Sequence, residues 1–423
     1  MDFNVYTALI AASVVVLLSY FYNALAGRTN IPSVLMLIVT GFIFSLFIEF
    51  NGKDLRPVLE ILGTVGLVMI VLEAALDLKL EKSKAGLLMK SLVIALILLL
   101  LTTFGIALII RFFYTVDRFE AIIYAIPLSI MSSAIIIPSV NKLVDEKKEF
   151  LIVEAAFSDI LGIMLFYFIL DTIDLDGVGT VSLHIVQNLG LTLVIAVAFG
   201  YLIIILIQKV TSEVKLFLPI AVLVLLYATG KLFHLSSLIF VLVFGLMLNN
   251  IKLFFRGFLK PYIIPEAYKE LLSEIKLITL ESSFLIRTFF FIAFGMSITL
   301  DGFNQISVFV VSFLALAVMF VLRWGAFKLI APKQMLPGIY VAARGLITIL
   351  LFYSIPVEHQ ITGFSPAVLF LIIIISNLIM MYGLIRNTDE PDQVVEAVDE
   401  SKIDELMEQP FDDSQDGFDQ KPD

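Results

Sequence analysis

The chain has 423 residues, of which 60% are hydrophobic and 16% are charged, and its mean hydropathy is +1.02. A soluble globular domain is nearer to half apolar and a quarter charged, so this composition excludes a water-soluble enzyme. The absence of cysteine excludes disulfides, thiol nucleophiles and cysteine-bound metals. The sequence has no HExxH pair and no GxGxxG or GxxxxGKS/T phosphate loop. We therefore expect no cofactor, no catalytic metal and no nucleic-acid partner.

The acidic residues are concentrated at the C-terminal end. The formal net charge is −10, but residues 387–423 contain 14 Asp and Glu against two Lys, which leaves residues 1–386 with a balance of +2. A polar, acidic segment of this kind has too little apolar surface to form a core. We predict a transmembrane domain over residues 1–386 and a disordered cytoplasmic tail over residues 387–423.

Apolar runs long enough to cross a bilayer fill the first 386 residues. A membrane helix needs about 20 apolar residues to span roughly 30 Å of hydrocarbon. In chain order, the predicted spans cover residues 5–25, 31–50, 58–78, 87–113, 119–143, 149–170, 182–208, 214–230, 235–251, 276–300, 306–330, 334–356 and 363–385. The sequence therefore predicts an all-α polytopic membrane protein with about 13 transmembrane helices in a lipid bilayer.

The basic residues of the loops predict the orientation of the chain. Cytoplasmic loops of membrane proteins carry an excess of Lys and Arg. Sixteen basic residues lie in one alternate set of loops, which includes the C-terminal edge of the last span, and five lie in the other set. We therefore expect the protein in the cell (inner) membrane, with the N-terminus outside and the C-terminus in the cytoplasm.

Two of the predicted spans contain residues that break helices. The fifth span has Pro127 and Pro138 on either side of a serine-rich stretch, and the twelfth has Pro337. Prolines also kink ordinary membrane helices, which is the alternative interpretation of each break taken alone. Because the two breaks lie seven spans apart, they favour two inverted repeats, spans 1–6 and 8–13, as in secondary transporters. Residues 252–270 are predicted to form a linker between the halves.

Ionisable residues within the apolar spans are the candidates for transport chemistry, because a charge at the bilayer centre costs about 2.5–3.5 kcal/mol on insertion scales. Asp159 lies at the middle of the sixth span, and Glu154 precedes it by five residues, about 140° around a helix. The two carboxylates therefore point in different directions. We interpret Asp159 as the residue on the ion route, and Glu154 as half of a buried ion pair with Arg323 or Arg344.

Further charges lie in the third and tenth spans. Glu73 is the deeper of two acids in the third span, and Asp77 follows one turn nearer the cytoplasm. We expect Glu73 to contact the ion route and Asp77 to lie at the interface. Arg287 in the tenth span is expected to pair with Glu281 in a structural role. The alternative for all these residues is that they only neutralise one another.

The sixth span carries a recognisable motif. Glu154, Ser158 and Asp159 follow the pattern E-x-x-x-N/S-D. This segment resembles the monovalent cation:proton antiporters, in particular the NhaP-like sodium/proton exchangers of the first cation:proton antiporter superfamily. The LEAAL segment around Glu73 is similar to the FEAG-like segment of that family. The resemblance implies a homodimer with a mobile core domain in which two broken helices cross.

The resemblance extends over about residues 26–384 and includes departures from the family pattern. Arg323 and Arg344 match the arginines of the eleventh and twelfth helices of the family. The fifth-helix Thr-Asp-Pro of the family appears here as Ser133-Ala134-Ile135, so its acidic residue is missing, and the Asn before Asp159 is a serine. These changes keep the proton carrier and remove oxygens that could bind a cation.

The sequence predicts a secondary active transporter rather than an enzyme, which exchanges a monovalent cation for a proton by alternating access, with Na⁺ favoured over K⁺. Deprotonated Asp159 would hold the cation, helped by Ser158, Ser133, Ser132 and Glu73, and protonated Asp159 would not. With one alternating carboxylate, we expect electroneutral 1:1 exchange. The alternatives are a proton-insensitive cation channel or another transporter on the same fold, and an intramembrane enzyme such as a lipid-modifying transferase.

Overall fold

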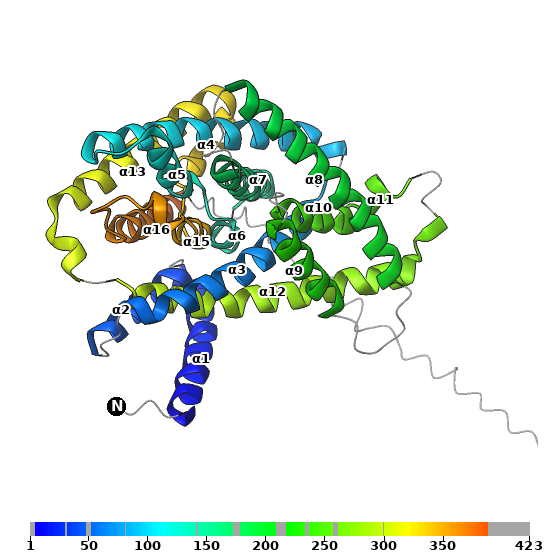
Figure 1. Cartoon of the computed structure of the whole chain (residues 1–423), viewed down its shortest axis with the longest axis horizontal. Coiled ribbons are helices and arrows are strands. Elements are labelled where there is room, and N and C mark those ends of the chain that lie inside the picture. The colour runs from blue at the N-terminus through cyan, green and yellow to red at the C-terminus, as the bar shows by residue number, and fades with distance from the viewer. Residues whose placement is uncertain are drawn as a thin grey trace, which may run out of the picture.

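The computed structural model describes residues 5–29, 32–47, 52–80, 82–140, 143–171, 178–208, 217–232, 237–256, 261–298 and 300–387, and every regular element in these ranges is a helix (Figure 1). Eight described segments are long and apolar enough to cross a membrane, and three further apolar helices have 10–17 residues. The fold is therefore that of a multi-pass membrane protein, as predicted. The number of about 13 spans stays a prediction. The predicted tail lies outside the described residues from 388 onward.

One group of helices packs around α3 and α12. Its members are α1 (Val5–Thr29), α2 (Ser33–Phe47), α3 (Gly52–Asp77), α8 (Val178–Ile207), α9 (Phe217–Leu232), α10 (Ser237–Asn249), α11 (Ile251–Phe254) and α12 (Pro265–Met296). The long helix α12 packs along α2 and α3, and α10 packs between α3, α8 and α9 (Figure 1). We call this set the α12 group.

The other group packs around α4 and α7. Its members are η1 (Lys82–Lys84), α4 (Ala85–Phe113), α5 (Arg118–Ser129), α6 (Ser133–Ser139), α7 (Asp145–Asp171), η3 (Leu300–Asn304), α13 (Ile306–Ile330), η4 (Pro332–Gln334), α14 (Met335–Gly338), α15 (Leu346–Tyr353), η5 (Val357–His359) and α16 (Ala367–Arg386). Helix α4 contacts α5, α7 and α13, and α13 packs on α16. We call this set the α7 group.

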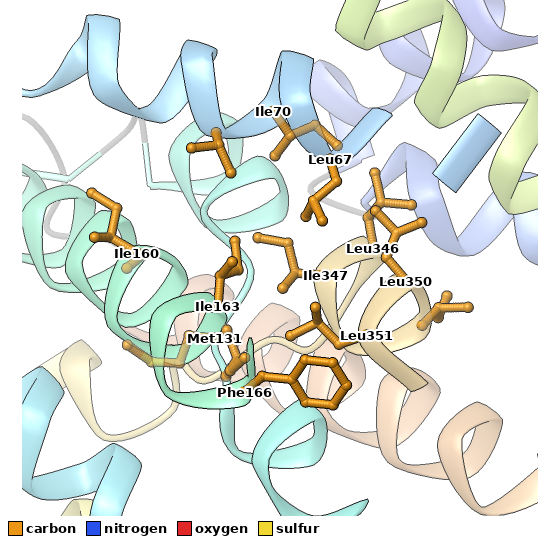
Figure 2. Close-up of a cluster of buried hydrophobic side chains, with 14 of the residues drawn as sticks. Leu67, Ile70, Met131, Ile160, Ile163, Phe166, Leu346, Ile347, Leu350 and Leu351 are labelled. Carbon is orange, nitrogen blue, oxygen red and sulfur yellow. The ribbon is translucent and has the colours of Figure 1, made fainter. Parts of the chain in front are cut away.

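An apolar cluster joins the two groups. Leu67 and Ile70 of α3 face Ile163 of α7 and Ile347 and Leu350 of α15 (Figure 2). All five side chains are at least nine-tenths buried. At about 25 cal/mol per Å² of apolar surface removed from water, such clusters hold soluble domains together, but in lipid the contribution comes from close packing. We call these residues the α3–α7–α15 cluster.

Within the α12 group, α2 and α12 approach each other at two glycines. A methyl group on Gly41 would overlap the main-chain carbonyl oxygen of Ile292, and one on Gly295 would overlap that of Ile38. Small residues allow membrane helices to bring their backbones together, which is where their packing energy comes from. The two glycines therefore set the distance between α2 and α12.

Both predicted helix breaks are present. Helix α5 ends at Ser129, residues 130–132 are extended, and α6 begins at Ser133. The second break runs over residues 339–345, between α14 and α15. A proline lies just before each break: Pro127 in the last turn of α5 and Pro337 in α14.

The predicted linker 252–270 is shorter in the structure. Helix α11 occupies Ile251–Phe254, and α12 begins at Pro265, five residues before the predicted end of the linker. Proline is favoured at the first position of a helix, where its missing N–H has no helical partner to lose. The sequence placed Pro265 in the linker and began the next span at residue 276, whereas α12 already begins at Pro265.

Candidate functional site

The two helix breaks meet at the centre of the α7 group. The main-chain N–H of Ser132 donates to the carbonyl oxygen of Ala343 at 2.9 Å, which links the first break to the second. Gly345 lies against Ser132 so closely that a methyl group there would come within 2.7 Å of Oγ of Ser132. Unwound backbone is tolerated at membrane depth only where other groups satisfy it, and here each break satisfies part of the other.

Asp159 lies on α7 beside this crossing. Its side chain is buried, with the residue 2% exposed. The main-chain N–H of Ser133, at the start of α6, donates to Oδ2 of Asp159 at 3.0 Å. Among the described residues, Oδ1 of Asp159 has no hydrogen-bond partner, and neither does Oγ of Ser132. The crossing therefore presents a buried carboxylate with one oxygen engaged and one oxygen free.

Ser158 and Ser133 bind the first break to α7. The main-chain N–H of Met131 donates to Oγ of Ser158 at 3.0 Å, and the N–H of Ser133 makes the bond to Asp159. Two consecutive residues of α7 thus accept from the unwound segment and its continuation. This pattern explains why a short polar side chain is needed before Asp159. A hydroxyl accepts from the freed N–H and can still donate its own proton.

Glu154 and Arg323 form a buried ion pair. Nη1 and Nη2 of Arg323 donate to the two carboxylate oxygens of Glu154 at 2.7 and 2.9 Å. Arg323 is 2% exposed and Glu154 is fully buried. Nε of Arg323 donates to the carbonyl oxygen of Gly338 at 2.8 Å, and its guanidinium lies 4.5 Å from the ring centroid of Phe327. The pair ties α7 to α13 and to the end of α14.

Arg344 binds main-chain oxygens at the second break instead of a carboxylate. Its Nε donates to the carbonyl oxygen of Leu128 at 2.8 Å, and its Nη1 donates to that of Ala342 at 2.8 Å. Leu128 lies in the last turn of α5, where the carbonyl oxygens of a helix lack helical partners. In the described part of the chain, Arg344 forms no ion pair with Glu154. The predicted three-residue cluster is thus a Glu154–Arg323 pair with Arg344 placed between the two breaks.

Two residues of α16 that the sequence interpretation missed hold Arg344 in place. The main-chain N–H of Arg344 donates to Oγ of Ser376 at 3.1 Å, and Nδ2 of Asn377 donates to the carbonyl oxygen of Arg344 at 2.9 Å. Both side chains are fully buried. A Ser-Asn pair inside an otherwise apolar span was the signal that could have revealed them, because buried polar side chains in lipid need partners.

Glu73 is engaged by Arg287 on α12. Nη1 of Arg287 lies 3.3 and 3.2 Å from the two carboxylate oxygens of Glu73, and Nη2 lies 3.4 Å from Oε1. The expected partner of Arg287, Glu281, accepts instead from the hydroxyl of Tyr20 at 3.3 Å. The sequence interpretation was wrong here because it paired residues along one helix, whereas Arg287 reaches across to α3.

The Glu73–Arg287 pair lines a cavity between the two groups. The cavity has a volume of about 300 Å³, and Asp77 and Ser33 contribute further polar lining. Residues of α6, among them Ala134, also line the cavity. Ala134 follows Ser133, whose N–H binds Asp159. The cavity therefore reaches to within one residue of the Asp159 contact.

The four buried charged residues at the crossing balance one another. Asp159 and Glu154 are the buried acids at the crossing, and Arg323 and Arg344 are the buried bases there. With Asp159 ionised the set is neutral, and with Asp159 protonated or bound to a monovalent cation it carries one positive charge. The protonated and cation-bound forms of the site thus have equal charge.

Comparison with known proteins identifies the family of this chain and shows structures with a similar fold. A family model described as sodium/hydrogen exchanger, transmembrane, matches residues 13–384. The fold is similar to a structure of the sodium proton antiporter MjNhaP1 from Methanocaldococcus jannaschii at pH 8, with a TM-score of 0.69 and 18% identity, over 92% of this chain and 100% of that chain. A three-dimensional electron-microscopy map of the same antiporter gives a TM-score of 0.64 at 18% identity, over 91% and 96% of the chains. No curated protein sequence matches significantly.

Proposed function

The chain belongs to the sodium/hydrogen exchanger family, and from this membership we propose that it exchanges a monovalent cation for a proton at Asp159, with Na⁺ preferred to K⁺. It is a transporter rather than an enzyme, and a multi-pass membrane protein. The distribution of basic residues supports an orientation with the N-terminus outside and the C-terminus in the cytoplasm.

The observation that carries this proposal is the half-satisfied carboxylate of Asp159. Its Oδ2 accepts from the N–H of Ser133, while Oδ1 has no partner among the described residues. A buried carboxylate oxygen without a hydrogen-bond partner is costly even where nearby arginines balance its charge. A proton or a cation at Oδ1 removes this cost. Only one of them can occupy the oxygen, so their binding is mutually exclusive.

The oxygens around Asp159 suit a hard monovalent cation. Oγ of Ser132 is buried and has no partner in the described ranges, and Oγ of Ser158 lies on the neighbouring residue of α7. Hard cations prefer oxygen ligands. We infer that the cation binds Asp159 with Ser132, Ser158 and Ser133 as neighbouring oxygens. When it leaves, the proton that replaces it comes from water on the side to which the site is open.

The arrangement of the two helix groups supports alternating access. Along α3, the apolar cluster at Leu67 and Ile70 is followed one to two turns later by the polar cavity at Glu73 and Asp77. An apolar layer next to a polar cavity is what a site open to one side and closed to the other requires. We infer that the α7 group moves relative to the α12 group, so that the site opens first to one side of the membrane and then to the other.

The experiment that tests the function uses the purified full-length protein in liposomes that contain a pH-sensitive dye and a proton gradient. Addition of Na⁺, K⁺ or Li⁺ in turn is expected to dissipate the gradient, most strongly with Na⁺. Protein-free liposomes give the background. A cation flux that is equally fast with and without a proton gradient would contradict exchange and favour a channel.

A further inference from the structure

The protein contains two arginine–glutamate pairs that differ in tightness. In the Arg323–Glu154 pair the donor–acceptor distances are 2.7 and 2.9 Å, and the side chains are 2% and 0% exposed. In the Arg287–Glu73 pair the distances are 3.2–3.4 Å, and the side chains are 17% and 20% exposed. Charge-assisted bonds of this kind are usually about 2.7–2.9 Å long. The Arg287–Glu73 pair is therefore loose, and it faces the cavity rather than a closed interior.

The loose pair lies next to the proposed cation site but belongs to the other helix group. Glu73 and Arg287 come from α3 and α12, and residues of α6 also line the cavity. One of them, Ala134, follows Ser133, whose main-chain N–H donates to Asp159. A cation in this cavity would meet Glu73 before it reached Asp159. The charge that Glu73 presents to it depends on Arg287.

We propose that Arg287 is a positioning residue that keeps Glu73 from binding the transported cation, so that Asp159 is the only carboxylate free to exchange a cation for a proton. This inference rests on the proposed function and assigns a specific role to a pair outside the helix crossing. The guanidinium occupies both oxygens of Glu73 and cancels its charge. Removal of Arg287 would add one negative charge to the cavity wall, and removal of Glu73 would add one positive charge.

The two changes therefore have opposite effects on cation affinity. In liposomes with the full-length protein, Arg287→Gln is expected to lower KM for Na⁺ about tenfold without raising kcat, which is the change that one unit charge about 12 Å from a bound ion causes at an effective dielectric constant of about 20. Glu73→Gln is expected to raise KM by a similar factor. The double variant Glu73→Gln/Arg287→Gln removes both charges and should return KM to near the wild-type value.

A conservative variant separates charge from packing. Arg287→Lys keeps the positive charge but loses the planar fork that contacts both oxygens of Glu73, so if the charge is what acts, KM should stay closer to wild type than in Arg287→Gln. Thermal unfolding in detergent is measured for every variant. If Arg287→Gln does not fold, the KM of Glu73→Gln compared with that of the double variant still tests whether Arg287 acts on the cation through its charge. A double variant with KM as high as that of Glu73→Gln would overturn the proposal and make Glu73 a direct cation ligand.

An unchanged KM in both single variants would also overturn the proposal, because neither charge would then act on the cation. These outcomes are distinct from a failure of the proposed function. If the wild-type protein exchanges no cation for protons, the function itself is wrong. If the wild-type protein exchanges Na⁺ and only the variants behave otherwise than expected, the role assigned to Arg287 is wrong and exchange at Asp159 stands.

Discussion

Two carboxylates on one helix differ because of what surrounds each of them. Glu154 and Asp159 lie five residues apart on α7, and both are almost completely buried. Glu154 has a guanidinium nitrogen on each oxygen, whereas Asp159 has a single main-chain N–H on one oxygen. A carboxylate that is fully paired is fixed in its charged form, and one that is half paired can change its occupant.

Replacement of Asp159 by asparagine is expected to abolish exchange and to leave folding intact. Asparagine has nearly the same shape and can still accept from the N–H of Ser133, but it neither releases a proton nor carries a charge for a cation. Proton-coupled Na⁺ flux in liposomes should fall to the protein-free background. Glu358→Gln, which removes an exposed carboxylate at η5, is the control and should behave as wild type. Residual coupled flux in Asp159→Asn would refute the site assignment.

Replacement of Glu154 by glutamine is expected to affect stability first. Removing one partner of a buried ion pair leaves the other charge uncompensated and costs about 3–5 kcal/mol. Thermal unfolding in detergent should show a large decrease in Tm. The matched control is Glu149→Gln, because Glu149 pairs with Lys84 at the exposed surface, where a pair contributes about 0–1 kcal/mol. A Glu154→Gln protein that is as stable as wild type but inactive would place Glu154 in the transport site.

The sequence could identify these acids but not all of their partners. The sequence left Arg323 and Arg344 as alternative partners of Glu154, and the structure pairs Glu154 with Arg323. The partners of Arg344 are carbonyl oxygens of Leu128 and Ala342, which become available only because α5 and α14 end there. Which main-chain groups a break leaves free depends on the three-dimensional crossing. The spacing of side chains in the sequence therefore cannot predict which main-chain groups are free.

The positions of helices and of helix breaks were predicted better than the contacts of side chains, because prolines and apolar length can be read from the sequence. All four ends of the two breaks lie inside the predicted fifth and twelfth spans, close to the prolines Pro127 and Pro337 that indicated them. The start of α12 at Pro265 was missed, since proline marks both loops and first helix positions. The approach of α2 to α12 at Gly41 and Gly295 was not predicted either, because a glycine within a span does not indicate which other helix packs against it.

Substitution of Gly295 by alanine is expected to destabilise the α12 group. A methyl group there would overlap the carbonyl oxygen of Ile38, which is backbone and cannot rotate away. Overpacking of this kind costs about 1–3 kcal/mol. The matched control is Gly325→Ala on α13, where a methyl group meets nothing within 4 Å. Thermal unfolding in detergent should show a lower Tm for Gly295→Ala only; equal Tm values would show that α2 and α12 can separate without cost.

At the scale of the whole chain, the acidic tail and the membrane domain differ in net charge. Deletion of residues 388–423 removes the segment with a balance of −12 and leaves a body of nearly neutral charge. Because the tail has no core-forming pattern, the shortened protein is expected to fold and exchange Na⁺ at the wild-type rate. The measurement is the rate of Na⁺-driven dye response as a function of pH. A shift of the pH profile by more than about one unit would indicate that the tail regulates transport.

The balance of buried charges leads to the last prediction, which concerns stoichiometry. The charge balance counts Arg323 and Arg344 as guanidinium cations, the form in which arginine occurs in proteins. Glu154 and Glu73 are each paired with an arginine, so under the proposed function Asp159 is the one carboxylate of these three that alternates between proton and cation. The protonated and cation-bound sites carry the same charge, and exchange is expected to be electroneutral, one proton for one Na⁺. Liposomes clamped at different voltages with valinomycin and K⁺ would measure this, with Na⁺ as the transported ion. The Na⁺ gradient that just balances a given proton gradient should be the same at every voltage. If that balance point moves with membrane potential, more than one proton accompanies each Na⁺, and Glu73 would be the second proton carrier.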